Sequence, residues 1–342
     1  MEKVLVTGAG GYIGSILVPK LLEKGFKVKA LDRFFFGANT LSNNDNLEII
    51  KEDSRKIKGD IFVGVTYVID LAAISNDPSG ELFQEATYQI NYITRKNNAI
   101  MAKKAGVKIY ILPSSCSIYG FQDKGIIVDE TWPANPLTTY AKANEMAEKD
   151  ILKLADDRFT AVVLRLATVF GLSPRMRFDL AINGMSYGAV KNHIIPLMRD
   201  GTQWRPMVHV HDVTDVMCLL LEADPEIVNS QIFNVGSNAQ NFKLAFLAEE
   251  IIKEMPFNVE VEWYGDPDHR SYKVNFDKIE RVLNWKAQKS ATDGAREIYE
   301  AMTHGDLEKT DQTITLDWYK ELTKWHKLIK DIEMYEGIIE ID

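Results

Sequence analysis

The segment KVLVTGAGGYIG at residues 3–14 constrains the fold of this chain more than any other feature. A strand-like apolar run leads into three glycines, Gly8, Gly11 and Gly14, and the stretch that follows has helical spacing. Glycines at this spacing allow a tight turn, close approach of the backbone to a pyrophosphate and close packing of helix on strand. Asp32 closes the next strand-like run about 20 residues further on. A glycine triplet alone indicates only a tight turn, but strand, helix and acid together predict a bound dinucleotide.

The acid at the end of the second strand also indicates which dinucleotide is bound. Asp32 can accept hydrogen bonds from the hydroxyls of the adenosine ribose, and its negative charge would repel a 2'-phosphate. The sequence therefore predicts NAD over NADP, a preference that the neighbouring Arg33 weakens slightly.

The rest of the first half alternates short apolar runs with amphipathic stretches, which is typical of βαβ units and a parallel sheet. Strands are expected at 3–7, 27–31, 48–50, 67–71, 108–113 and 160–166, and helices at 12–24, 83–105 and 140–154. After Gly171 come Arg/Pro-rich loops, a strand and helix passage, a short strand (QIFNVG) and a charged helical C-terminus. We expect an α/β fold with a doubly wound parallel (Rossmann) sheet at 1–172. A smaller mixed α/β lobe is expected at 173–342, with exchange between the two around 205–235.

Composition excludes several classes of protein. A net charge of -9 and a pI near 5.3 argue against a broad nucleic-acid surface. The two cysteines, Cys116 and Cys218, suggest neither a disulfide framework nor a zinc site. No run of about 18 apolar residues and no leader are apparent, so we expect a cytoplasmic protein without a membrane partner.

Further motifs follow in a fixed order along the chain: DLAA (70–73), SSCSIYG (114–120), PLTTYAKAN around Tyr140, RLATVFG (165–171) and GTQWRPMVHVHDV (201–213). Together with the glycine turn, this set resembles the extended short-chain dehydrogenase/reductase family, in its nucleotide-sugar epimerase and dehydratase branch. The resemblance runs from residue 1 to about residue 285. It implies a Rossmann domain that holds NAD, a C-terminal lobe that holds a nucleoside diphosphate sugar, and chemistry at the sugar C4 that starts with hydride transfer. It also implies a homodimer formed through the helices at 83–105 and 140–154, although their apolar stripes could instead face the core.

Tyr140 matches the catalytic tyrosine of this family, which takes the proton of the sugar hydroxyl. A tyrosine with an ordinary pKa near 10 needs nearby positive charge to act as a base. The family places a lysine four residues later, but this chain has Asn144 there. Lys142 is no substitute, because two residues along a helix point to different faces. Asn144 can still hydrogen-bond the nicotinamide ribose without bringing charge.

Three interpretations of this departure stay open. The pKa of Tyr140 could be lowered by NAD and Ser115, with activity rising toward alkaline pH. Another cation, from the fold or from a dimer partner, could fill the gap. Alternatively, the chain could bind a nucleotide sugar with weakened catalysis.

The serine motif discriminates between reactions. By resemblance, Ser115 matches the Ser/Thr that hydrogen-bonds the sugar hydroxyl together with the tyrosine. In 4,6-dehydratases an Asp-Glu pair follows, which supplies the acid and base for eliminating water. Here Cys116 and Ser117 occupy those positions, and by resemblance both are expected to bind the substrate. The glutamate typical of decarboxylases is absent for the same reason. Reversible oxidation at C4 remains, most simply 4-epimerisation.

Other residues are assigned to the site by resemblance. Arg205 and Arg270 match arginines that pair with the diphosphate, and guanidinium groups suit phosphate because they donate two parallel bonds. Arg175 and Arg177 are candidates to close over the substrate. Asn183 matches a position near the diphosphate or sugar, though it could be a buried helix amide. The cofactor site is expected to include Gly8, Gly11, Tyr12, Ile13, Gly14, Asp32, Asp53, Leu71, Ala72 and Ala73.

Two other groups of polar residues are assigned structural roles. His209, His211 and Asp212 invite a metal interpretation, but no third well-spaced ligand follows and Asp212 and Thr214 suit a helix start, so no metal is predicted. Asn91 is expected to be structural. The leading hypothesis is an NAD-dependent 4-epimerase of a nucleotide sugar. The alternatives are a 4-dehydrogenase or 4-keto reductase, less favourably a 4,6-dehydratase, and a binding protein with weakened catalysis.

Overall fold

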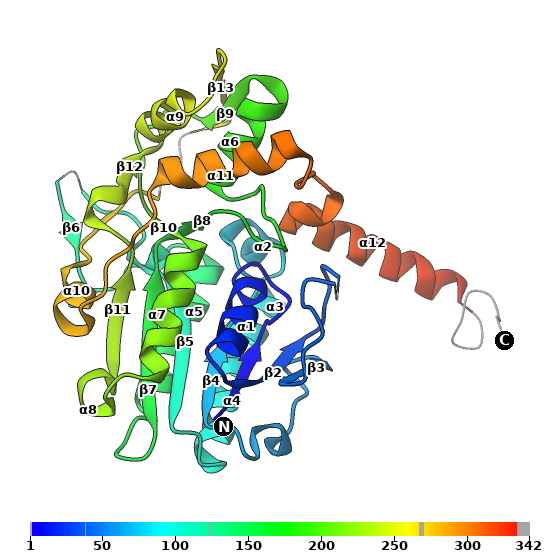
Figure 1. Ribbon diagram of the computed structural model, residues 1–342, viewed down its shortest axis with the longest axis vertical. Helices are drawn as coiled ribbons and strands as arrows, with labels where there is room; N and C mark the ends of the chain where they lie inside the picture. The colour runs from blue at the N-terminus through cyan, green and yellow to red at the C-terminus, as the bar shows by residue number, and fades with distance from the viewer. Residues whose placement is uncertain (1, 38, 124, 267–269, 334–342) are drawn as a thin grey trace.

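The central layer of the molecule is a parallel β-sheet. The structure, a computed structural model, describes residues 2–37, 39–123, 125–266 and 270–333. Within these residues the sheet has seven strands in the order β11-β7-β5-β4-β1-β2-β3 (Figure 1). The strands are β1 (Lys3–Thr7), β2 (Lys27–Asp32), β3 (Leu47–Lys51), β4 (Tyr67–Asp70), β5 (Ile109–Ser115), β7 (Thr160–Leu166) and β11 (Gln231–Val235). All neighbouring pairs run parallel, so the predicted doubly wound α/β fold is confirmed.

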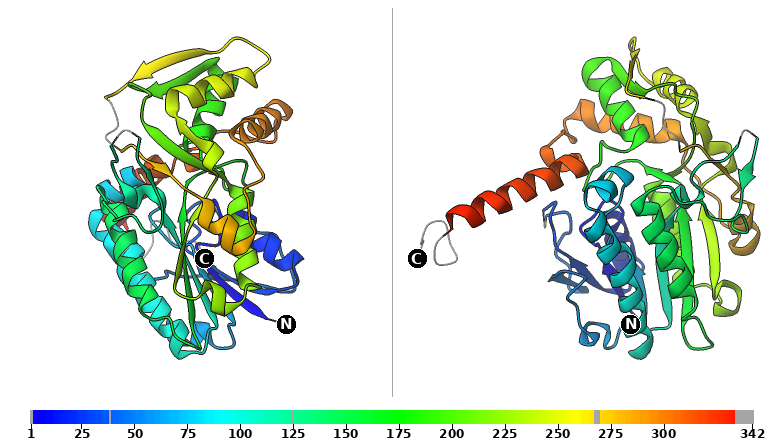
Figure 2. Two further views of the ribbon diagram at one scale, coloured as in Figure 1. Left: turned by 90° about the vertical axis from the view of Figure 1, so that its left-hand side faces the viewer. Right: turned by 180° about the vertical axis from the view of Figure 1, so that it is seen from behind.

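Helices cover both faces of the sheet, which explains why its strands are apolar almost throughout. On one face α1 (Gly14–Glu23) packs beside α7 (Val210–Leu221). On the other face α4 (Arg95–Lys104) packs beside α5 (Thr139–Leu152) (Figure 2, right). Both α7 and β11 follow the second-lobe strand β10 (Trp204–His209) in the sequence. Even so, β11 is an edge strand of the central sheet and α7 packs on a face of that sheet.

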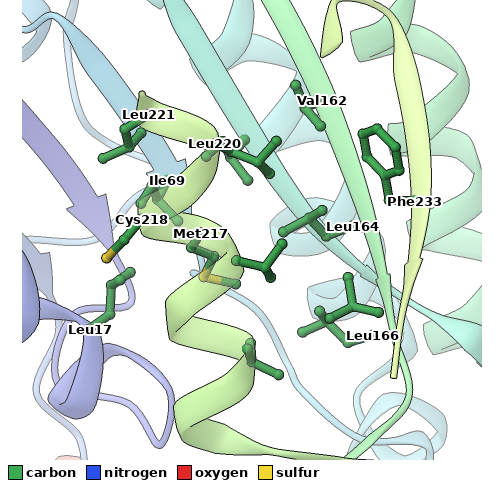
Figure 3. Packing of buried hydrophobic residues seen from close by; sticks show 14 of the residues in the cluster. Leu17, Ile69, Val162, Leu164, Leu166, Met217, Cys218, Leu220, Leu221 and Phe233 are labelled. Carbon is green, nitrogen blue, oxygen red and sulfur yellow. The ribbon is translucent and has the colours of Figure 1, made fainter. Parts of the chain in front are cut away.

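The core beneath α7 is densely apolar. Figure 3 shows Met217 and Leu220 of α7 facing the sheet residues Ile69 and Leu164, with Leu17 of α1 beside them. All five side chains are fully buried. Burying one such side chain contributes about 1.5–3 kcal/mol, so this interface fixes the sheet whose ends carry the site.

The helix expected at 83–105 is interrupted. It is observed as α3 (Gln84–Tyr88), a π-helical segment η2 (Gln89–Thr94) and α4, and it is preceded by α2 (Asp77–Leu82). Asn91, in η2, turns its buried amide onto the main chain of Ile74. Its Oδ1 accepts from Ile74 N at 2.9 Å and its Nδ2 donates to Ile74 O at 2.9 Å. These bonds satisfy the polar groups of the loop after β4, which accounts for the buried polar side chain in the widened turn.

The second lobe has its own smaller core. Its sheets pair β10 with β8 (Thr168–Phe170) and β12 (Asn241–Lys243), and β9 (Ile194–Met198) with β13 (Glu260–Tyr264). The helices α6 (Ala181–Asn192), α9 (Leu244–Lys253) and α11 (Ala291–His304) pack on one another. The remaining elements are β6 (Ile127–Val128), β14 (Lys273–Val274), α8 (Pro225–Val228), α10 (Asp277–Leu283) and the short 3-10 turns η1 (Gly59–Phe62), η3 (Cys116–Tyr119), η4 (Asn238–Gln240) and η5 (Asp311–Thr313).

The last helix, α12 (Thr315–Ile332), projects from the body as an arm (Figure 1). Its first turns contact the segment that follows β2, where Trp318 Nε1 donates to Phe35 O at 2.6 Å. Its distal half exposes Trp325, Leu328 and Ile332. None of the helices within the described residues combines the length and the apolar character needed to span a membrane.

Candidate active site

A cavity of about 930 Å³ lies at the carboxyl ends of the parallel strands, between the sheet and the second lobe. Gly8, Asp32, Leu71 and Ser115, at or just beyond the ends of four different strands, all line it. In doubly wound sheets ligands bind outside the carboxyl ends of the strands, so this cavity is the candidate site.

The glycine turn forms one wall of the cavity. Gly8 has a φ of +67°, and a Cβ there would lie 2.7 Å from the carbonyl carbon of Leu71. A Cβ on Gly14 would lie 2.5 Å from Gly8 O. Only glycine fits at both positions, because a side chain would push α1 off the sheet.

The N-terminus of α1 carries free donors. The backbone N–H groups of Tyr12, Ile13 and Gly14 have no acceptor among the described residues, and all three residues line the cavity. Free N–H groups at the positive end of a helix bind phosphate. The turn therefore fits the pyrophosphate of NAD.

Two of the predicted acids lie at or just after the ends of β2 and β3. The carboxylate of Asp32 accepts from Gly10 N at 3.0 Å and from Phe34 N at 2.7 Å, and burial raises its pKa. Asp53 pairs with Arg55 at 2.6 Å and with Arg33 at 3.0 Å. The hydrogen bonds from Arg55 are the main cause that lowers the pKa of Asp53 to about 2. Both acids line the cavity.

The predicted catalytic residues come together at the other end. Tyr140 lies in the first turn of α5, whose start is capped by Thr138 Oγ1 accepting from Ala141 N at 3.2 Å. Tyr140 and Ser115 both line the cavity. Burial and the charge of Asp77 raise the pKa of Tyr140, while the charge of Arg95 and the polar side chains of Ser115 and Asn144 oppose the rise.

Asn144 is only 1 % exposed and is held from one side. Its Oδ1 accepts from Arg95 Nη1 at 2.9 Å, whereas its buried Nδ2 has no partner within the described ranges. Lys142 is exposed, as its helical spacing predicts. An unpartnered buried donor beside the tyrosine fits a hydroxyl of the nicotinamide ribose, which supports NAD binding at this end.

The residues after Ser115 face different ways. Ser117 lines the cavity, and its Oγ is buried without a partner within the described residues. Cys116 does not line the cavity: it is 1 % exposed and its thiol contacts Arg165 O at 3.2 Å. Consecutive side chains of the 3-10 turn η3 point in different directions, and that of Cys116 points into the core rather than into the cavity.

Asn183, predicted near the substrate, is also internal. It is fully buried, its Oδ1 accepts from Gly171 N at 2.9 Å, and its Nδ2 donates to Arg177 O at 2.9 Å and to Tyr12 Oη at 3.1 Å. This amide ties α6 to two loops around the cavity without lining it. The alternative interpretation, a buried helix amide, describes its position in the structure.

Arginines from the second lobe face the cavity. Arg205 and Arg270 both line it, with Arg205 over the ring of Tyr272 at 5.3 Å. Arg270 forms an ion pair with Asp77 of α2. This ion pair places the guanidinium of Arg270 beside the carboxylate whose charge acts on Tyr140.

Arg175 and Arg177 lie on the loop between the lobes. Arg177 pairs with Asp179 at 2.7 Å. Arg175 stacks over Phe36 at 3.6 Å, and its Nε and Nη1 are buried without partners among the described residues. Burial, followed by the charge of Arg177, lowers the pKa of Arg175 to about 9. Both arginines line the cavity, and the two unpartnered nitrogens of Arg175 can donate hydrogen bonds to an anion.

Sequence reasoning missed two contributions to the site. The first is α12, whose Tyr319, Leu322, Thr323 and His326 line the cavity. Nothing in the local sequence of α12 indicates where it docks. The second is Arg95, which is 3 % exposed on the same side of its helix as Asn91. A charged residue four positions after Asn91, which the sequence assigns a structural role, was a signal that could have been followed.

The histidine cluster has structural partners. His209 pairs with Glu297 at 2.7 Å, and the carboxylate of Asp212 accepts from the main-chain N–H groups of Gln288 and Lys289. His211 N–H donates to His209 Nδ1. In the part of the chain that the structure describes, no group of three or more His, Cys, Asp or Glu side chains is arranged to hold a metal.

Comparisons with known proteins agree with this geometry. UDP-glucose 4-epimerase of Lactobacillus helveticus is 27% identical over 362 residues, which cover 95% of this chain and 97% of that protein. UDP-glucuronic acid decarboxylase 1 of Arabidopsis thaliana is 26% identical over 306 residues, covering 85% of this chain and 68% of that protein. UDP-glucuronic acid 4-epimerase from Bacillus cereus, solved in complex with UDP-glucuronic acid and NAD, shares the fold with a TM-score of 0.79. It is 21% identical and covers 88% of this chain and 99% of that chain.

A family model extends the agreement over most of the chain. The model of the NAD dependent epimerase/dehydratase family matches residues 4–236. This match contains the glycine turn, the serine motif and Tyr140, and its NAD dependence confirms the predicted cofactor. The chain belongs to the NAD dependent epimerase/dehydratase family.

Proposed function

We propose that this protein is an NAD-dependent enzyme that oxidises a nucleoside diphosphate sugar at C4 and reduces it again from the other face, a 4-epimerase. The observation that carries the proposal is the meeting of Tyr140 and Ser115 in a cavity whose other wall is a dinucleotide-binding glycine turn. Relatives named as 4-epimerases support it.

NAD, when bound, supplies the acceptor for the hydride from C4 and later returns it. Tyr140 accepts the proton of the C4 hydroxyl and gives it back to the ketone oxygen, so the net reaction moves no electrons and no protons. Ser115 holds the same oxygen by a hydrogen bond, which keeps the hydroxyl aligned with the tyrosine. The open Nδ2 of Asn144 orients the ribose next to the reacting carbon.

The carboxylates of the cavity favour epimerisation over elimination. Eliminating water needs an acid and a base beside the sugar ring. Asp77, whose charge raises the pKa of Tyr140, already forms an ion pair with Arg270. It also accepts a hydrogen bond from the hydroxyl of Thr138 at 2.5 Å. Ser117, where dehydratases carry an acid, offers only a hydroxyl. A 4,6-dehydratase is therefore the weaker candidate.

The diphosphate is proposed to bind at the second lobe. Arg205 and Arg270 can donate charge-assisted hydrogen bonds to phosphate oxygens, each worth about 1.5–3 kcal/mol. The unpartnered hydroxyl of Ser117 is available to the sugar ring. In this arrangement the arginines hold the diphosphate and hydroxyl groups contact the sugar. The sugar ring is then free to turn in the cavity, which a change of face at C4 requires.

Two alternatives are each supported by one observation. Retention of a keto sugar, as in a 4-dehydrogenase or 4-keto reductase, would use the same Tyr140 and Ser115. A binding protein with weakened catalysis is favoured by the asparagine at position 144. We also propose a homodimer through α5 and the helix formed by η2 and α4, because Ile93 of η2 and Met146 of α5 are each 38% exposed. Size-exclusion chromatography with light scattering tests the dimer, and a monomer would reject it.

Incubation with a panel of UDP, GDP, dTDP and CDP sugars at pH 7 and pH 9 tests the function. NMR of the sugar ring would show a 4-epimer, and absorbance of reduced nicotinamide would show net oxidation. Tyr140→Phe is the matched control, since it removes one hydroxyl from the same fold. Binding of NAD and a nucleotide sugar without any product in wild type would establish the binding protein instead.

A further inference from the structure

Asn144 leaves Tyr140 without the positive charge that a lysine at this position would supply. A tyrosine base needs a positive charge nearby, and the side chain four residues after it is neutral. The structure does bring a cation to this place, from a different helix. Arg95 Nη1 donates to Asn144 Oδ1 at 2.9 Å across a sequence separation of 49 residues.

A second hydrogen bond of its side chain helps to hold Arg95 in this position. It begins α4 directly after the π-helical segment η2, and its Nε donates to Ala72 O at 3.1 Å. Ala72 lines the cavity just beyond β4. One guanidinium group therefore bridges the end of β4 and the buried face of α5, immediately behind the catalytic end of the site.

The charge on this guanidinium lacks a direct counterion. Among the described residues, no carboxylate forms an ion pair with Arg95, although the side chain is 3 % exposed. Asp70 of β4 is already engaged by the hydroxyls of Thr7 and Tyr110. A buried unpaired cation is costly, so its field is available to stabilise a nearby anion.

The arginine also fixes the orientation of the amide. Guanidinium groups only donate hydrogen bonds, so Arg95 must face Oδ1 of Asn144 and never Nδ2. The amide donor is thereby directed away from Arg95, and it is the buried atom without a partner. Arg95 and Asn144 together present a donor backed by a positive charge, as a single lysine would.

We propose that Arg95 is a positioning residue that supplies the missing positive charge to Tyr140, with Asn144 as the oriented link between them. The proposal rests on the proposed function, because it assigns Arg95 a part in the activation of that base. Arg95 acts through Asn144 and does not touch the substrate. The opposing charge at this end is Asp77 of α2, which Arg270 partly neutralises. The other polar groups that face Tyr140 are Ser115 and Asn144.

A purely structural role for Arg95 makes a different prediction. If the guanidinium only held Ala72 O and Asn144, its loss would loosen the fold but leave the ionisation of Tyr140 unchanged. The two roles separate in a titration of Tyr140 that requires no substrate.

The experiment is a pH titration of the protein with bound NAD, followed by NMR of tyrosines labelled at Cζ. The chain has 13 tyrosines, and Tyr140→Phe identifies the signal of interest. Arg95→Gln should raise the pKa of Tyr140 by about one unit or more, or move its titration out of the accessible range. Arg95→Lys, which keeps the charge, should restore at least half of that shift. Equal values for wild type and a folded Arg95→Gln would overturn the proposal.

A swapped variant keeps the test decisive if Arg95→Gln does not fold. Arg95→Thr combined with Asn144→Lys moves the charge to position 144, and we expect a pKa of Tyr140 within about half a unit of wild type. A shift above one unit in that variant would overturn the proposal. The failure of each proposal is distinguishable: a shifted titration without turnover on any sugar rejects the epimerase alone, whereas turnover with an unshifted titration rejects the role of Arg95 alone.

Discussion

Replacing Tyr319 with alanine should weaken NAD binding. Tyr319 lies on the first turns of α12 and packs against Phe35, Phe36 and Phe83, with ring centroids 6.2, 5.6 and 6.3 Å away. It also lines the cavity, on the side where Asp32 lies. The helix therefore lies against the side of the cavity that carries Asp32, and Tyr319 is one of its lining residues there.

The size of the effect follows from these contacts. An aromatic pair is worth about 0.5–1.5 kcal/mol beyond its buried area, and an aromatic contact with a nucleobase about 1–3 kcal/mol. The aromatic contacts within the protein are lost from the NAD-free protein as well, and that part of the loss does not change the affinity for NAD. We therefore expect a net cost of about 1–2 kcal/mol in the free energy of NAD binding. That corresponds to an increase of about 5- to 30-fold in the dissociation constant for NAD.

Isothermal titration calorimetry with NAD measures this change directly. Leu328→Ala is the matched control, because Leu328 lies on the same helix, is 56% exposed and is outside the cavity. It should bind NAD like wild type. Tyr319→Phe should retain most of the affinity, since the ring remains. If Tyr319→Ala and Leu328→Ala bound NAD equally well, α12 would not be part of the cofactor site.

Three further predictions follow from the catalytic end and its support. Tyr140→Phe should lower turnover about 10²–10⁴-fold while NAD still binds; a loss below tenfold would remove Tyr140 from the chemistry. Because burial raises the pKa of Tyr140 and the base form is the ionised one, turnover should increase from pH 7 to pH 9, and a flat profile would contradict this role. Glu148→Gln removes the negative charge that pairs with the buried Arg165 at 2.8 Å. Urea denaturation should therefore show a loss of about 3–5 kcal/mol in the free energy of unfolding, and a loss under about 1 kcal/mol would show that the ion pair is dispensable.

The parts of the site that the sequence predicts are those encoded locally. The glycine turn and Asp32 are separated by one strand and one helix, so their spacing alone places them at one edge of the sheet. Ser115 and Tyr140 were found because each lies in a motif with a recognisable neighbourhood. Their convergence in the cavity follows from the parallel order of the strands.

The parts that the sequence could not supply depend on long-range packing. The contact between Arg95 and Asn144 joins two helices that meet only when the sheet has formed. The docking of α12 on the segment after β2 spans 283 residues between Trp318 and Phe35. Cys116 and Asn183 were assigned to the substrate from their positions in motifs, but a motif does not state which way each side chain points.

A nucleotide sugar carrying deuterium at C4 gives the most direct test of oxidation and return at that carbon. The proposed mechanism removes the C4 hydrogen as hydride and returns the same hydride from the other side. NMR of the product in ordinary water should therefore show the 4-epimer with its deuterium still at C4. Appearance of the 4-epimer with ordinary hydrogen at C4 would contradict the mechanism, because the hydrogen would then have exchanged with solvent.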